Sequence, residues 1–178
     1  GDFYERIKPR EGELWLTSGR INEIWQTMFD DDRRDYIKQR WPSQCVEIHP
    51  DDAKCHGIES GDEVLLVNDD VLIQTGGFIA VHQDDATFTR LEEQGHIRVG
   101  RGEMKAVAIV TEAVRPGVLW TNSLIPGSPA NSLVHRVPDP ITNRYRFKLG
   151  KAKIKRIGES PFKDDFSRMT FATRTVVV

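Results

Sequence analysis

The residues Thr17-Ser18-Gly19-Arg20 follow an apolar run and could bind an anion. The short side chains of Ser18 and Gly19 let backbone N–H groups approach a ligand closely, and Gly19 also permits a left-handed bend. Arg20 adds a planar fork of donors that suits a phosphate or a purine edge. Together they predict a small anion-binding nest at the end of a strand. From these residues alone, an ordinary turn with a solvent-facing arginine is the alternative.

The residues after Arg20 favour the ligand-binding interpretation. Asn22, Glu23 and Gln26 carry amide and carboxylate groups that can recognise a hydrogen-bonding edge. Trp25 offers a flat face against which a heterocycle can stack. A solvent-facing turn has no need of these side chains, so the sequence predicts a ligand pocket at this point.

A row of lysines near the carboxyl end is the second charged feature. Lys151, Lys153 and Lys155 recur at every second position, which places their ammonium groups on one face of a strand. Such a row can hold a polyanion, but it more often forms a solvated face or protects a sheet edge against aggregation. Lys148, beside Phe147, is the better candidate for a single phosphate.

Other side chains of catalytic or metal-binding type do not form a recognisable site. Cys45, His49, Cys55 and His56 are potential zinc ligands, but the adjacent Cys55 and His56 can hardly both face one ion. We therefore expect two free thiols and no metal site. Asn131, in the loop "PGSPANSL", could contact a purine or pterin edge or simply cap a turn. No catalytic triad emerges.

The composition excludes several classes of partner. A chain of 178 residues with a formal net charge of -2 and a pI near 6.2 has no bulk attraction for nucleic acid or for an acidic membrane surface. No apolar run approaches the roughly 20 residues of a membrane-spanning helix. The length suits one domain, which we assign to residues 1–178.

The pattern along the chain predicts many short strands and few helices. Strand character occurs at residues 13–16, 44–50, 64–67, 106–110, 118–120 and 145–158. Pro50 and the acids after it predict a short helix that ends at Gly57. Dense turn and charge signals predict an insertion with little regular core at 70–102 and a meandering tail at 157–178. The sum is a mostly-β barrel with short helices.

Four segments, taken in order, resemble one known family. They are "LWLTSGRINEIWQT", "VEIHPDDAKCHGIESGDEVLLVND", "KAVAIVTEAVRPGVLW" and "ANSLVHRVPDPITNRYRFK". This order is similar to the carboxy-terminal domain of the molybdopterin-guanine-dinucleotide oxidoreductases, the dimethyl-sulfoxide-reductase superfamily. "NEIWQT" followed by "YIKQRWP", and the closing "IGESPFKDDFSRMTFATR", resemble in particular the large subunit of arsenite oxidase and its relatives.

The resemblance implies a double-psi β-barrel, as in aspartate decarboxylase, that closes over a pterin dinucleotide. It implies cofactor contacts from the first strand end and from two later positions. The residues are Ser18, Gly19, Arg20, Asn22, Glu23, Trp25, Gln26, Thr27, Asn131 and Lys148. The family usually has Thr-Gly-Arg where this chain has Ser18-Gly19-Arg20, and a serine hydroxyl can make the same contact.

The resemblance also implies a function. The chain would bind and orient molybdopterin guanine dinucleotide, with its molybdenum, in an oxidoreductase that acts on a small oxyanion such as arsenite. Other domains of the same subunit would hold an iron–sulfur cluster, and a small iron–sulfur subunit would carry electrons. A periplasmic location is implied, with the cytoplasm as the alternative. A barrel adaptor without cofactor and a decarboxylase that cleaves itself at Gly127-Ser128 are the alternative functions.

Overall fold

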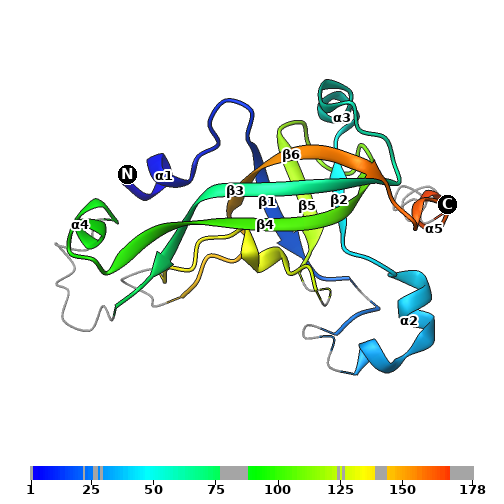
Figure 1. Cartoon of the computed structure of the whole chain (residues 1–178), viewed down its shortest axis with the longest axis horizontal. Helices are drawn as coiled ribbons and strands as arrows, with labels where there is room; N and C mark the ends of the chain where they lie inside the picture. The colour runs from blue at the N-terminus through cyan, green and yellow to red at the C-terminus, as the bar shows by residue number, and fades with distance from the viewer. Residues whose placement is uncertain are drawn as a thin grey trace.

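The computed structural model describes residues 2–21, 23–25, 28, 30–76, 88–123, 125, 127–138 and 144–168. Its strands form a closed barrel in the order β1-β5-β2-β4-β3-β6 (Figure 1). These strands are β1 (Leu14–Gly19), β2 (Cys45–Ile48), β3 (Asp62–Gln74), β4 (Ile97–Val110), β5 (Val118–Asn122) and β6 (Gly150–Glu159). The short helices are α1 (Asp2–Ile7), α2 (Asp35–Arg40), α3 (Pro50–His56), α4 (Phe88–Glu93) and α5 (Lys163–Arg168), with 3-10 turns η1 (Asp31–Arg33) and η3 (Ala130–Ser132).

The barrel mixes parallel and antiparallel pairs. β1 pairs with β5, and β2 with β4, in parallel, whereas the remaining neighbours are antiparallel. Parallel neighbours end at the same edge of a sheet, so the last residues of β1 and β5, Gly19 and Asn122, lie side by side. The prediction of a mostly-β, double-psi barrel with short helices is confirmed.

Alternating strand positions fill the barrel interior, as the period of two in a strand requires. The main core cluster includes Leu16, Val46, Ile48, Val64, Leu66, Met104, Ala106, Ala108, Leu119, Ala152 and Ile154. A second cluster lies outside the barrel, where Ile37 and Trp41 pack with Val107 and Ile109 of β4. The helix α2 therefore covers one outer face of the barrel.

The helix predicted after Pro50 is confirmed as α3, with both of its ends capped. His49 Nδ1 accepts a hydrogen bond of 3.2 Å from the backbone N–H of Asp51. Gly57 closes the helix in the left-handed region at φ 62° and donates its N–H to the last turn. Each of these signals is local in the sequence, which explains why the pattern predicted this helix.

The expectation of little regular core at 70–102 is wrong at both ends of that segment. β3 continues to Gln74 and pairs with the start of β4 at Ile97 after an irregularity between Asn68 and Val71. Figure 1 shows these two strands running beyond the barrel toward α4. A small hydrophobic core holds the extended ends of β3 and β4 together with α4, and its buried members are Leu72, Leu91, Ile97 and Val137. Charged side chains on the exposed faces hid the regular alternation.

The expected meandering tail is regular in its first part. β6 runs through Glu159, and α5 follows with Phe166 1% exposed in the second core cluster. The predictions for residues 70–102 and 157–178 differ from the structure for the same reason. Packing against distant segments orders stretches whose own sequence shows no regular pattern. Residues 77–87 and 169–178 lie outside the described residues.

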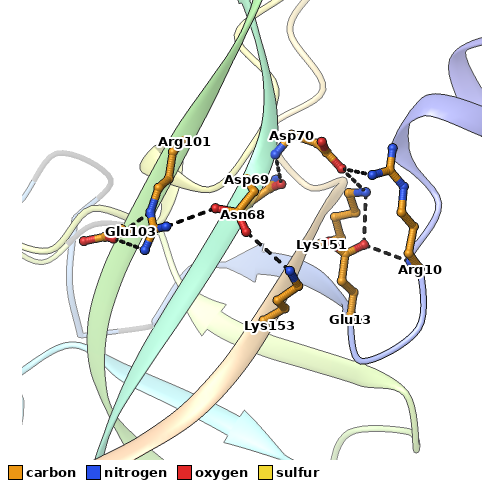
Figure 2. A network of polar contacts seen from close by, with 9 residues as sticks. All are labelled: Arg10, Glu13, Asn68, Asp69, Asp70, Arg101, Glu103, Lys151 and Lys153. Atoms are coloured by element: carbon orange, nitrogen blue, oxygen red, sulfur yellow. Dashed lines mark hydrogen bonds and ion pairs between the residues drawn. The ribbon is translucent and has the colours of Figure 1, made fainter.

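The lysine row of β6 divides into a buried and an exposed part. Lys151 is 0% exposed, and its Nζ lies 3.0 Å from Glu13 Oε2 and 2.9 Å from Asp70 Oδ2 (Figure 2). Lys153 and Lys155 are exposed. The expectation of a solvated row is therefore wrong for Lys151, because the segment before β1 and the irregular part of β3 around Asp70 cover it. Among the described helices, none is long and apolar enough to span a membrane.

Candidate functional site

A pocket opens where β1 and β5 end together. It is a small, open hollow, and it is lined by Gly19, Arg20, Ile21, Ile24, Trp25, Asn122 and Ser123. Three predicted residues, Gly19, Arg20 and Trp25, are among those that line it. The described residues thus place a concave surface at the point where the sequence predicted a ligand.

A folded turn after β1 presents Trp25 at this pocket. The backbone N–H of Trp25 donates to Asp31 Oδ2 at 2.6 Å, and the N–H of Met28 donates to the Trp25 carbonyl at 3.0 Å. Met28 adopts a left-handed φ of 52° and buries its side chain beside Ile21. The backbone is therefore anchored while the Trp25 side chain is 65% exposed, which leaves an indole face available for stacking.

Gly19 is required by packing rather than by a left-handed bend. It is a strand residue outside the left-handed region, so the predicted nest conformation is wrong. A Cβ at this position would lie 2.5 Å from the indole Nε1 of Trp120. The Gly19 carbonyl accepts from the backbone N–H of Ser123 at 2.8 Å and from its hydroxyl at 2.6 Å. Glycine therefore lets Trp120 and Ser123 close around the end of β1.

Gly19→Ala is expected to lower the free energy of unfolding by about 1–3 kcal/mol, because the new methyl group must displace the indole ring of Trp120. Urea unfolding followed by tryptophan fluorescence measures this loss. Gly158→Ala is the matched control, since no atom lies within 4 Å of a Cβ built there. Equal stability of the two variants would contradict the packing role of Gly19.

The other predicted site residues lie around the pocket or outside the described part of the chain. Ser18 is 6% exposed, and its hydroxyl donates to the Phe147 carbonyl at 3.2 Å. This bond brings Lys148, an exposed residue, next to the end of β1. Glu23 pairs with Arg40 at 3.0 Å instead of lining the pocket. Asn22, Gln26 and Thr27 lie outside the described residues.

Asn131 is exposed in η3, and it does not line the pocket. The loop around it is fixed to β4 by two hydroxyl groups. Ser132 Oγ donates to the Glu103 carbonyl at 2.7 Å, and Ser128 Oγ donates to the Lys105 carbonyl at 2.6 Å. The structure therefore brings Ser18 and Lys148 together but leaves Asn131 on a separate loop.

Asn122 is one of the pocket residues that the sequence interpretation did not select. It is 2% exposed, and its side-chain Nδ2 has no hydrogen-bond acceptor among the described residues. The sequence shows only an asparagine at the start of a loop rich in proline and asparagine. Its relevance comes from the parallel pairing with Gly19, which joins segments far apart in the chain.

The residues of metal-ligand type are dispersed. Cys45 is buried in β2, Cys55 is exposed in α3, and His49 caps that helix. Within the described ranges, no group of three histidine, cysteine, aspartate or glutamate side chains could hold a metal ion.

A family profile described as "Molydopterin dinucleotide binding domain" matches residues 14–71 and 68–150. The chain belongs to this family. It is similar to the iodate reductase subunit IdrA of Pseudomonas sp. (strain SCT), with 50% identity over 177 residues that cover 98% of this chain and 20% of that protein. IdrA of Denitromonas iodatirespirans matches with the same identity and coverage.

A third relative matches this chain over a shorter stretch. The arsenite oxidase subunit AioA of Herminiimonas arsenicoxydans is 40% identical over 57 residues, which cover 32% of this chain and 7% of that protein. Acetylene hydratase from Pelobacter acetylenicus is a solved structure with a TM-score of 0.48 and 15% identity, over 81% of this chain and 18% of its own. The chain spans about 20% of the length of the IdrA proteins.

The side chains that line the pocket are of types that can contact a nucleotide. A buried donor on Asn122 calls for an acceptor, because an unpaired buried donor costs about 1–3 kcal/mol. An exposed arginine suits a phosphate group, and the exposed Trp25 ring suits a flat heterocycle. These three features are the ones that a nucleotide, with its acceptors, charge and rings, satisfies together.

Proposed function

We propose that this chain binds and orients the molybdopterin guanine dinucleotide of a molybdenum oxidoreductase that acts on a small oxyanion. The pocket between the ends of β1 and β5 is the observation that carries the proposal. The 50% identity to iodate reductase subunits along 98% of this chain supports the oxyanion class. Iodate is the first candidate substrate, and arsenite is the second because of the local match to an arsenite oxidase subunit.

The chain contributes binding and orientation, while the bound cofactor supplies the redox chemistry. The exposed guanidinium of Arg20 pairs with phosphate oxygens at the pocket rim. Trp25 stacks against one ring system. Lys148 adds a second cation, since the hydrogen bond from Ser18 to Phe147 holds that segment beside β1. Asn131 remains a candidate contact from the loop at η3.

The proposed enzyme is larger than this chain. Further domains of the same subunit would hold the iron–sulfur cluster and any protein ligand of molybdenum, and a small iron–sulfur subunit would exchange electrons with it. We propose a periplasmic location. The family match along residues 14–150 favours cofactor binding over the adaptor and the self-cleaving decarboxylase.

A chimeric subunit tests the proposed function. The matched 177 residues of IdrA from Pseudomonas sp. (strain SCT) are replaced by this chain, and bound molybdenum and released guanine nucleotide are measured after purification. We expect the chimera to retain both. Arg20→Ala in the chimera is expected to lower both about tenfold, because it removes a charge-assisted hydrogen bond that contributes about 1.5–3 kcal/mol.

Arg115→Ala is the matched control for this experiment. Arg115 is also an exposed arginine, but it lies in the turn before β5, at the end opposite the pocket. We expect it to leave the cofactor content unchanged. A folded chimera without molybdenum and nucleotide would refute the proposed function, and equal cofactor content in both arginine variants would remove Arg20 from the site.

A further inference from the structure

The orientation of the Asn122 side chain is fixed by its neighbours. Its Oδ1 lies 3.5 Å from the backbone nitrogen of Cys45 and 3.7 Å from the Cys45 thiol. A backbone N–H can only donate, which favours the observed arrangement with the amide oxygen toward Cys45 and the amide nitrogen away from it. The Nδ2 group is a hydrogen-bond donor, and no described residue accepts from it.

The backbone of Asn122 is held as firmly as its side chain. Its carbonyl accepts from Gln44 Nε2 at 2.7 Å, and the same Gln44 nitrogen donates to Thr121 Oγ1 at 2.8 Å. Asn122 also pairs with Gly19 in the parallel ladder. Contacts with Gln44 and with β1 therefore position the Asn122 donor before any ligand arrives. Binding then costs little side-chain entropy at Asn122.

The chemistry around this donor is mainly apolar. Ile21 and Ile24 line the pocket beside Asn122, whereas Arg20 and the Trp25 indole are exposed at its rim. A phosphate group would favour the charged rim over a neutral amide between isoleucines. A flat ring with an oxygen or nitrogen acceptor on its edge suits this mixed lining, because its faces are apolar and its edge is polar.

We propose that Asn122 Nδ2 donates a hydrogen bond to the edge of the pyrimidinone ring that guanine and pterin share, while that ring stacks on Trp25. This inference rests on the proposed function and adds a residue that recognises the heterocycle rather than the phosphates. Asn122 is then a specificity residue, and Arg20 supplies the charge at the rim.

Nuclear magnetic resonance of the 178-residue chain tests the proposal without any substitution. The side-chain amide signal of Asn122 is followed while GMP, neopterin or ribose 5-phosphate is added. We expect GMP or neopterin to shift this signal and to quench the tryptophan fluorescence with one common Kd. Ribose 5-phosphate, which has the phosphate but lacks the ring, should leave the Asn122 signal in place. The compound that binds with the lower Kd, GMP or neopterin, indicates whether the pocket binds the guanine end or the pterin end of the dinucleotide.

Asn122→Asp gives a second test. The aspartate keeps an oxygen toward Cys45 and replaces the donor by an acceptor, so binding of the preferred ring compound is expected to weaken about tenfold or more. Asn68→Asp is the matched control. It makes the same amide-to-acid change at a buried asparagine, which bonds Leu133 and Asp70 and does not line the pocket. It should bind normally, even if it is less stable.

The outcomes separate this inference from the proposed function. Equal binding of GMP and ribose 5-phosphate, without a shift of the Asn122 amide, would overturn the inference and leave phosphate binding in place. The inference also fails if no probe binds, and the cofactor content of the chimera then decides the proposed function independently. If Asn122→Asp does not fold, the measurement on the unsubstituted chain still decides.

Discussion

Replacing Lys151 with methionine is expected to lower the free energy of unfolding by about 3–5 kcal/mol, the usual effect of removing one partner from a buried ion pair. Lys151 is 0% exposed between Glu13, which is 4% exposed, and Asp70 (Figure 2). Burial alone would raise the pKa of Asp70, but the hydrogen bond and charge of Lys151 outweigh it and lower that pKa. Without the ammonium group, two carboxylates would remain with less compensation. Denaturant unfolding measures the loss.

Lys153→Met is the control for that variant. Lys153 lies on the same strand, but its side chain is 56% exposed and reaches Asp69 only at 3.4 Å. Exposed pairs of this kind contribute little, so we expect a change within about 0.5 kcal/mol. If both variants lost the same stability, the ion pairs of Lys151 would not be structural. Adding Glu13→Leu to Lys151→Met should recover part of the loss, because it removes the carboxylate left behind.

The unfolding free energy is expected to fall by about 3 kcal/mol as the pH decreases from 6.5 to about 4, because of His135. Burial lowers the pKa of His135 to about 4, and the nearby Lys151 cation adds to that effect. In the unfolded chain an imidazole has a pKa of about 6.5. The unfolded state therefore takes up the proton first, so the stability present above pH 6.5 is lost progressively down to about pH 4.

His135→Asn is the variant that checks this pH dependence. Its amide oxygen can accept the 3.1 Å hydrogen bond that the Leu72 N–H donates to His135 Nδ1, while the titrating ring is gone. Unfolding curves between pH 4.5 and 7.5 should be flatter for the variant than for the original chain. The carboxylates of Asp62 and Asp70, whose pKa values are lowered, act mainly below about pH 4 and do not obscure this range. A folded chain in which the His135 ring titrates near 6.5 would refute the prediction.

The sequence predicted the elements whose signals are local. Pro50 and Gly57 mark the two ends of α3, and alternating residues mark the barrel strands. The lysine row shows where such reasoning stops. A period of two correctly groups Lys151 with Lys153 on one face, but it does not say which part of that face another segment covers. Glu13 and Asp70, which bury Lys151, are far from it in the chain.

The same limit applies to the candidate site. Gly19, Arg20 and Trp25 were found because they are contiguous and their side chains suit a ligand. The role of Gly19 was misassigned, because the indole that it accommodates belongs to Trp120 on another strand. Asn122 was not selected, since its burial and its unpaired donor follow from contacts with Cys45 and Gln44. Side chains can be nominated from the sequence, but their partners require the fold.

The strand order also constrains how the protein is made. β1 pairs with β5 and β6, so during synthesis β1 waits for residues 118–122 and 150–152. Until then its edges have no native neighbour, and contacts this distant in the chain form slowly. The barrel therefore closes only after most of the chain has been synthesised. The pocket between β1 and β5 likewise takes shape only after residues 118–122 have joined β1, so its two walls come from segments made about a hundred residues apart.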